Sequence, residues 1–192
     1  MNTTAHVAAS LFLGKSKEES ASPTALITGA IVPDAPMFVF FGIVTAAGHS
    51  GKEIWGELYF REGWQLFFDI FNSAPLFALL WAIGQWRNWP WLTWMSISAL
   101  LHIACDLPLH HDDSHRHFLP FSQFRFASPV SYWDPKHWGI PVAILEATLT
   151  IAGSAYLVAR SASKLVRISA IIILALYALA SCMLIIWVLG LR

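Results

Sequence analysis

The sequence predicts an all-α, polytopic helical membrane protein with about five transmembrane helices plus a short N-terminal helix. Three observations support this fold class. Hydrophobic residues make up 56% of the 192 residues and charged residues only 12%, whereas soluble domains average about 25% charged residues. The mean hydropathy is +0.55. Five mostly apolar stretches have the length of about 20 residues that is needed to span a bilayer. Ten tryptophans, several at the ends of these stretches, fit the aromatic belts of membrane interfaces.

The lengths of the apolar stretches define the predicted spans. An apolar segment at Thr3–Leu13 precedes them and is too short to cross a bilayer alone. No repeat or linker divides the sequence, so we expect one integral membrane domain over residues 1–192. The five predicted spans are Ala25–Ala47, Trp64–Trp86, Trp91–Leu109, Gly139–Ala159 and Ile168–Leu191.

Basic residues predict the side of the membrane on which each loop lies. With five crossings, the short loops that carry Lys15, Arg87 and the segment 160–167 share one side. Short loops rich in lysine and arginine stay cytoplasmic. We therefore expect an inner or plasma membrane protein whose His/Asp-rich segment 110–138, here called the polar loop, is non-cytoplasmic. The 12 basic and 12 acidic residues balance, so no net basic field predicts nucleic acid as a partner. The apolar composition instead predicts the lipid bilayer and a lipid-like substrate as partners.

Polar residues of several predicted spans fall at a common depth. At a rise of about 1.5 Å per residue, they form one layer nearer the non-cytoplasmic face. An isolated ionisable group in the hydrocarbon costs at least about 2.5–3.5 kcal/mol, and a shared cation would offset that cost. The sequence thus predicts a metal site. The layer contains His6, Asp34, Asp69, Asn72, His102, Asp106 and Glu146.

Each of the main candidates also has a plain structural interpretation. His102 and Asp106 lie four residues apart on one helix face, a spacing that serves a metal ion or a simple His–Asp hydrogen bond. Asp34, within "PDAP", could be a ligand, a helix cap, or both. The assignment of His6 depends on its depth alone. Asp69, Asn72 and Glu146 are candidates for positioning rather than for direct binding.

The polar loop offers further ligands. Residues 100–120, "LLHIACDLPLHHDDSHRHFLP", hold five of the eight histidines, and zinc prefers histidine combined with carboxylates. We expect two or three of the loop side chains to join the ligands from the helices, although a solvated polar loop is the alternative. Asp134 and His137, later in the loop, are weaker candidates. The loop candidates are His110, His111, Asp113, His115 and His117.

Several short segments resemble the YdjM-like membrane-bound metal-dependent hydrolases. These are "NTTAH", the later "PD", "LLHIACDLP" and "HFLPFSQFRFASP", within residues 1–130. The resemblance implies a small multi-span protein in which His6, Asp34, His102 and Asp106 bind the metal. The sequence departs from that family where a His-Arg-Gly-x-Thr-His-Ser stretch is usual, because "FDIFNSAP" has Asn72 in place of a histidine.

The expected activity is hydrolysis of a lipid-like ester or phosphoester by a metal-activated water. Zn²⁺, as one or two ions, is the expected cofactor, with Fe or Mn as alternatives. Asp112 or Glu146 would act as general base, and Arg116 would bind a phosphate oxygen. A di-iron membrane oxygenase and a non-enzymatic metal-ion carrier are the competing interpretations, although the chain has few histidines outside one cluster and no repeat symmetry.

Overall fold

The computed structural model describes residues 1–15 and 21–188, with side chains as far as residue 180. Helices are the only regular elements in this part of the chain, which confirms the all-α prediction. They are α1 (Thr3–Lys15), α2 (Pro23–Ile31), α3 (Ala35–Ala46), α4 (Gly51–Glu53), η1 (Ile54–Leu58), α5 (Glu62–Phe71), α6 (Ala74–Trp86), α7 (Pro90–Asp106), η2 (Pro135–His137), α8 (Gly139–Arg160) and α9 (Lys164–Val188).

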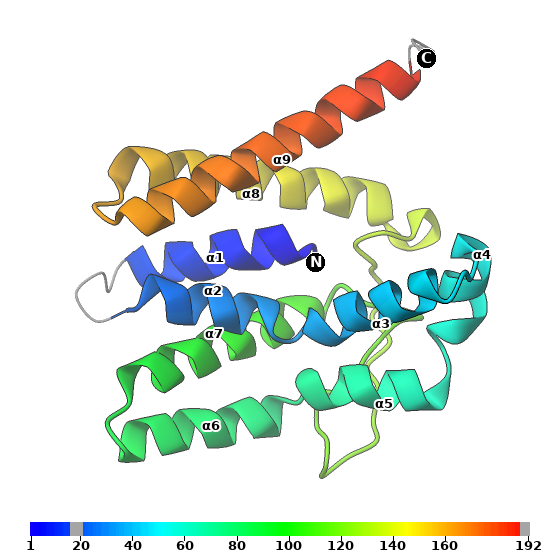
Figure 1. Ribbon diagram of the computed structural model, residues 1–192, viewed down its shortest axis with the longest axis horizontal. Helices are drawn as coiled ribbons and strands as arrows, with labels where there is room; N and C mark the ends of the chain where they lie inside the picture. Colours follow the sequence, from blue (N-terminus) through cyan, green and yellow to red (C-terminus); the bar gives the residue numbers. More distant parts are fainter. Residues whose placement is uncertain (16–20, 189–192) are drawn as a thin grey trace.

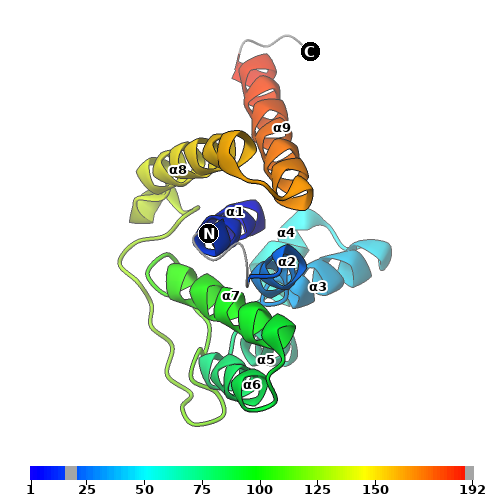
Figure 2. The same cartoon turned by 90° about the vertical axis from the view of Figure 1, so that its left-hand side faces the viewer.

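The short first helix lies at the centre of the molecule. Viewed end-on, α1 is enclosed by α8 and α9 on one side and by α2 and α7 on the other, with α6 beyond α7 (Figure 2). In the side view the same helices lie in layers above and below α1 (Figure 1). Apolar side chains such as Leu11, Leu26 and Leu157 fill the space between α1, α2 and α8. Helix α1, whose apolar segment is too short to span a bilayer, is therefore part of the protein core.

Close packing of α2 on α7 fixes the frame around α1. A Cβ atom at Gly29 would lie 2.0 Å from the Met95 carbonyl oxygen, so only glycine permits this approach. Next to it, the Ser98 hydroxyl lies 2.6 Å from the Leu26 carbonyl oxygen and 2.8 Å from the Ser10 hydroxyl. These buried hydrogen bonds join three helices at one point.

Two helices are interrupted at matching places. Between α2 and α3 the chain bends by 53°, as expected from the two prolines of "PDAP", which cannot continue a helix ladder. Between α5 and α6 the helix breaks at Asn72–Ser73. The Asn72 side-chain amide donates to the carbonyl oxygens of Pro33 and Phe68, each at 3.1 Å, so the two breaks are joined directly.

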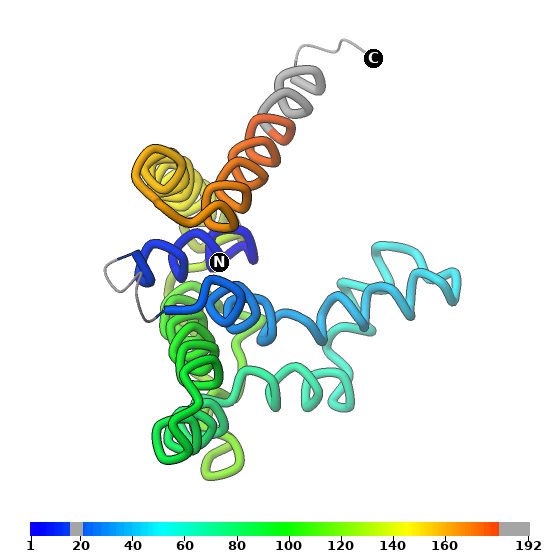
Figure 3. The backbone as a smooth tube through the Cα atoms, turned by 60° about the vertical axis from the view of Figure 1, so that its left-hand side comes forward, coloured from blue at the N-terminus to red at the C-terminus, as the bar shows by residue number. Residues whose placement is uncertain are grey.

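The segment from α3 to α5 extends away from the central helices (Figure 3). Its two long helices are held together by an aromatic cluster around the buried ring of Phe40, which contacts Tyr59, Trp64 and Phe68. This arm forms one wall of the cavity described below.

Fewer helices than predicted could cross a membrane. Among the described residues, two helical segments are long and apolar enough. They are Glu62–Trp86, which is α5 and α6 counted together, and Gly139–Arg160, which is α8; the bent pair α2–α3 makes a third if it is one span. The prediction of five spans is wrong on this count. Helix α7 has only 17 residues, about 26 Å of rise, which is less than the about 30 Å hydrocarbon core. The predicted span Ile168–Leu191 extends outside the described residues.

Candidate metal centre

Three side chains from two helices form a buried group at the centre of the molecule. His6 lies on α1, and His102 and Asp106 lie one turn apart on α7. His6 Nε2 lies 2.9 Å from Asp106 Oδ1, and His102 Nε2 lies 3.0 Å from Asp106 Oδ2. One ligand atom from each residue lies within 4.8 Å of the others. The three residues, each at most 3% exposed, could therefore hold one metal ion.

The orientation of the His102 ring fits a metal ligand. Its Nδ1 lies 2.8 Å from the carbonyl oxygen of Ala30, and because a carbonyl can only accept, Nδ1 carries the proton. In the neutral ring, Nε2 therefore presents a lone pair to the carboxylates of Asp106 and Asp34, at 3.0 and 3.5 Å. Lone pairs facing one another repel, so a cation or a second ring proton must lie there. Metal-binding histidines commonly donate their other N–H to a carbonyl in this way.

Asp34 lies at the start of α3 but does not act as its cap. Its carboxylate accepts no capping hydrogen bond from the helix backbone. Instead, Asp34 Oδ2 accepts from the Thr3 hydroxyl at 2.5 Å, while Oδ1 faces His102. Of the two interpretations of "PDAP", the geometry favours the ligand over the side-chain cap. The set of two imidazoles and two carboxylates is one that Zn²⁺ accepts.

The first residue of the polar loop also reaches the group. His110 Nε2 lies 3.6 Å from Asp106 Oδ1, and His110 Nδ1 lies 2.9 Å from Asp113 Oδ2. Burial alone would lower the pKa of His110, but its two carboxylate neighbours outweigh burial and raise that pKa to about 9. Asp113 also accepts a hydrogen bond from the Trp133 indole at 3.0 Å. Asp113 thus supports His110 and lies outside the central group.

Glu146 of α8 holds the start of α1. Its carboxylate accepts from the side-chain amide of Asn2 at 2.5 Å and from the Asn2 backbone N–H at 3.3 Å. The amino group of Met1 lies 2.6 Å from Asp106 Oδ1. Glu146 therefore fixes the position of the helix that carries His6, which agrees with a positioning role.

A second polar network fastens the loop to α5. The carboxylate of Asp69, which is fully buried, accepts from Arg116 Nε and from Arg125 Nη2, the latter at 3.0 Å. His115 Nδ1 lies 3.1 Å from Asp69 Oδ1, and Arg116 also pairs with Glu62 at 2.7 Å. The guanidinium of Arg116 is thus engaged within the protein.

The loop then covers the break between α5 and α6. His117 Nδ1 lies 3.1 Å from the Asn72 carbonyl oxygen, and the Ala74 N–H donates to the His117 carbonyl at 2.8 Å. The Ser73 hydroxyl donates to the Leu119 carbonyl at 2.6 Å. Burial, together with nearby His115, lowers the pKa of His117 to about 4. These contacts satisfy backbone groups that the interrupted helix leaves unpaired.

The structure divides the predicted site residues into separate groups. Asp34 and His110 join the central three, whereas His111 lies apart and stacks on His137. Which of these residues bind metal or take part in catalysis stays a prediction. The remaining candidates lie at the other places described: His115, Arg116 and His117 on the α5–α6 segment, Asp113 beside His110, Glu146 on Asn2, and Asp112 at the cavity below.

A cavity of about 650 Å³ lies beside the central group. Asp34 and His110 line it, as does Asp112, whose side chain is 69% exposed. Much of its remaining surface is aromatic, from the arm and from the loop. No lysine or arginine is among the described residues that line it. The aromatic lining consists of Phe38, Trp55, Tyr59, Phe60, Phe68, Tyr132 and Trp133.

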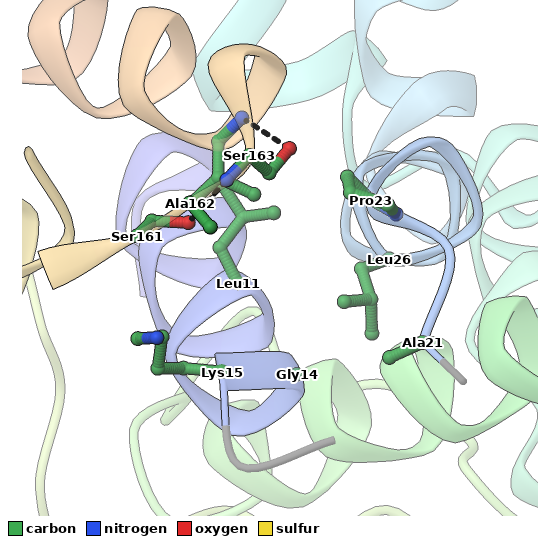
Figure 4. Close-up of a pocket in the computed structure, with 10 residues that line it drawn as sticks. Leu11, Gly14, Lys15, Ala21, Pro23, Leu26, Ser161, Ala162 and Ser163 are labelled. Carbon is green, nitrogen blue, oxygen red and sulfur yellow. Dashed lines mark hydrogen bonds between the residues drawn. The ribbon is translucent and has the colours of Figure 1, made fainter. Parts of the chain in front are cut away.

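A smaller cavity of about 120 Å³ lies elsewhere, where α1, α2 and the α8–α9 turn meet. Leu11 and Ser161–Ser163 line one side of it, and Pro23 and Leu26 the other (Figure 4). None of the histidines or carboxylates discussed above borders it. This cavity is therefore separate from the candidate metal centre.

The sequence predicts neither the contact of Thr3 nor the partners of Asp69. Thr3 lies in the short apolar segment, yet its hydroxyl donates to Asp34. Asp69 is a positioning candidate of the polar layer, and the structure surrounds its carboxylate with Arg116 and Arg125. A signal for the second was present, since a lone carboxylate within a span needs a partner and the polar loop supplies two arginines.

Comparison with known proteins adds one match. The family described as "Domain of unknown function (DUF4184)" matches residues 2–99, which include His6 and Asp34 and end before His102. No match supports membership of a hydrolase family, and none conflicts with it. Neither a curated protein nor a solved structure matches the chain.

Proposed function

The chain belongs to the DUF4184 family, and we propose that it is a membrane-embedded, metal-dependent hydrolase of a lipid-like ester or phosphoester. The observation that carries the proposal is the buried group of His6, His102 and Asp106 next to a large aromatic cavity. A bound divalent ion, with Zn²⁺ expected and Fe or Mn as alternatives, would lower the pKa of a coordinated water from about 16 to about 7.

The protein's own residues would then take distinct roles. His6, His102 and Asp106 hold the ion, because one ligand atom of each meets the others at one point, and Asp34 joins them through its approach to His102. Asp112 is the stronger candidate for general base, since it lines the cavity with an exposed carboxylate.

Two of the expected catalytic residues are already engaged. Glu146 is committed to Asn2, so it positions α1. Arg116 is committed to Asp69 and Glu62, so we assign it to anchoring the loop rather than to binding a phosphate oxygen.

The cavity favours an apolar substrate with an uncharged reacting group. Its volume of about 650 Å³ lies within the about 300–1,000 Å³ usual for small-molecule sites. Aromatic walls bind apolar chains, and the described lining provides no basic side chain for a phosphate. A phosphoester would depend on the metal alone for charge compensation, so we expect an ester to be the better substrate.

Access from the membrane is consistent with this substrate class. Helix α8, which follows the polar loop directly, exposes Ile144 and Leu149 by more than half of their surfaces. We propose that these side chains face lipid and that the loop lies on the non-cytoplasmic side, where the cavity would meet one leaflet.

Metal content and lipid turnover test the proposal together. Purified protein should contain about one or two equivalents of divalent metal by elemental analysis and release fatty acid from a lipid ester in detergent micelles. His102→Gln should lose most of both. His49→Gln is the matched control, because His49 lies outside the site with a side chain 41% exposed. Metal-free purified protein, or unchanged hydrolysis in His102→Gln, would overturn the proposal.

A metal-ion carrier is the second candidate, favoured by the two broken helices that meet at Asn72 and Pro33. Interrupted helices commonly carry the ion sites of transporters. Zinc flux into proteoliposomes without any lipid hydrolysis would favour the carrier over the hydrolase.

A further inference from the structure

Two histidines that the proposed function does not use form a pair at the outer part of the polar loop. The rings of His111 and His137 stack with centroids 3.7 Å apart and planes 24° from parallel. Backbone hydrogen bonds bring these distant parts of the loop together: Ser128 N–H donates to the His110 carbonyl at 2.9 Å, and Ser131 N–H to the His137 carbonyl at 2.7 Å. The pair is thus built into the fold of the loop.

Both rings are anchored at the same nitrogen. His111 Nδ1 lies 2.5 Å from the Ser128 carbonyl oxygen, and His137 Nδ1 lies 2.7 Å from Asp134 Oδ2. Because a carbonyl or carboxylate oxygen accepts, each Nδ1 carries a proton, and each neutral ring presents the lone pair of Nε2. Donation of one ring N–H to a carbonyl or carboxylate is the arrangement found behind metal-binding histidines.

The central group shares the ring stacking and has one of the two anchors. There, the rings of His6 and His102 stack with centroids 3.5 Å apart and planes 9° from parallel, and His102 is anchored through Nδ1 to a backbone carbonyl. The outer pair differs in exposure, since the side chains of His111 and His137 are 27% and 31% exposed. Ions from solvent can therefore reach the outer pair directly.

A carboxylate lies next to the outer pair. Asp112 Oδ1 is 3.4 Å from His111 Nε2, and the same residue lines the large cavity. A negative charge beside the His111 nitrogen favours a divalent cation there. Asp112 also connects the pair with the cavity that leads to the central group.

We propose that His111 and His137 form a second metal site, at the edge of the large cavity. It takes a transition ion that accepts imidazole ligands, such as Zn²⁺, Ni²⁺ or Cu²⁺, through the two Nε2 atoms, with water completing the coordination and Asp112 supplying charge. With only two protein ligands it binds more weakly than the central group, as suits a site that captures ions.

Histidine modification with diethyl pyrocarbonate, located by mass spectrometry, tests the site in the full-length protein. Addition of Zn²⁺ should protect His111 and His137 together, while exposed His49 stays reactive and serves as the internal control. In His137→Gln, zinc should no longer protect His111. In His102→Gln, protection of the outer pair should persist, which separates this site from the central one. Equal protection of His111 with and without His137 would overturn the proposal.

Copper binding provides a second, spectroscopic test. Addition of one equivalent of Cu²⁺ beyond the ions already bound should give an electron paramagnetic resonance spectrum with hyperfine coupling to two imidazole nitrogens. His111→Gln should reduce that coupling to one nitrogen. A spectrum without nitrogen coupling in the unaltered protein would refute the second site, whether or not the central group holds metal.

Discussion

The His102 ring is held at both of its nitrogens, one by the Ala30 carbonyl and one by facing carboxylates. Its spacing from Asp106 could be predicted from the sequence, because residues four apart share a helix face. The approach of His6 could be predicted only as a matching depth. The contribution of His110 could not be predicted by residue, since the path of an irregular loop depends on distant partners such as Asp69.

Removal of the Thr3 hydroxyl should weaken metal binding. Thr3→Val keeps the shape of the side chain but removes the donor that orients Asp34. Loss of such an outer hydrogen bond typically reduces metal affinity by about 10–100-fold, which competition with a chromogenic chelator would measure. Thr45→Val, at an exposed position on α3, is the matched control. Equal affinity in the two variants would remove Asp34 from the ligand set.

Among the helices, the paired breaks at Pro33–Asp34 and Asn72–Ser73 shape the site. The first could be predicted, because two prolines in "PDAP" cannot continue a regular helix. At the second, the sequence predicts one continuous span, Trp64–Trp86, because "FNSAP" contains a single proline and has apolar neighbours on both sides. What interrupts the helix is tertiary: the polar loop supplies partners for the backbone around Ser73. Local sequence patterns do not report such partners.

Replacement of Asn72 by aspartate should destabilise the joined breaks. Asn72→Asp removes the N–H groups that bind the Pro33 and Phe68 carbonyls while it preserves side-chain shape. Buried acceptors left without donors cost about 1–3 kcal/mol, so thermal unfolding in detergent should occur at a clearly lower temperature. Asn88→Asp, in the exposed turn before α7, should have little effect. Similar melting temperatures for the two variants would contradict the proposed junction.

For the whole molecule, apolar length predicted the helical class but overcounted the helices able to cross a bilayer. Helix α7 illustrates the reason. Its apolar side chains pack against α2 and α6, and residues such as Met95, Ala99 and Ile103 are buried within the protein. Composition does not distinguish a helix surrounded by protein from one surrounded by lipid. Helix α8 has an apolar exposed face instead, which is the feature that a bilayer would cover.

A charge in the middle of α8 should impair its membrane insertion. Leu149 is 63% exposed, and Leu149→Lys should shift the insertion equilibrium by about 3 kcal/mol, measured by glycosylation mapping of a chain translated into microsomes. Glu57→Lys, an exposed change outside the apolar helices, controls for added positive charge. Unimpaired insertion of the Leu149 variant would show that this face of α8 does not contact lipid.

The central position of α1 has a consequence for the order of assembly. This helix is synthesised before α7 and α8, which enclose it, and at least 75 residues separate them, since α1 ends at Lys15 and α7 begins at Pro90. Until α7 and α8 are made, the buried polar side chains of α1, such as His6 and Ser10, lack the partners that these helices supply. Docking of α1 onto α7 then brings together two distant parts of the chain. A metal ion bound between His6 and the α7 residues His102 and Asp106 would stabilise that late contact.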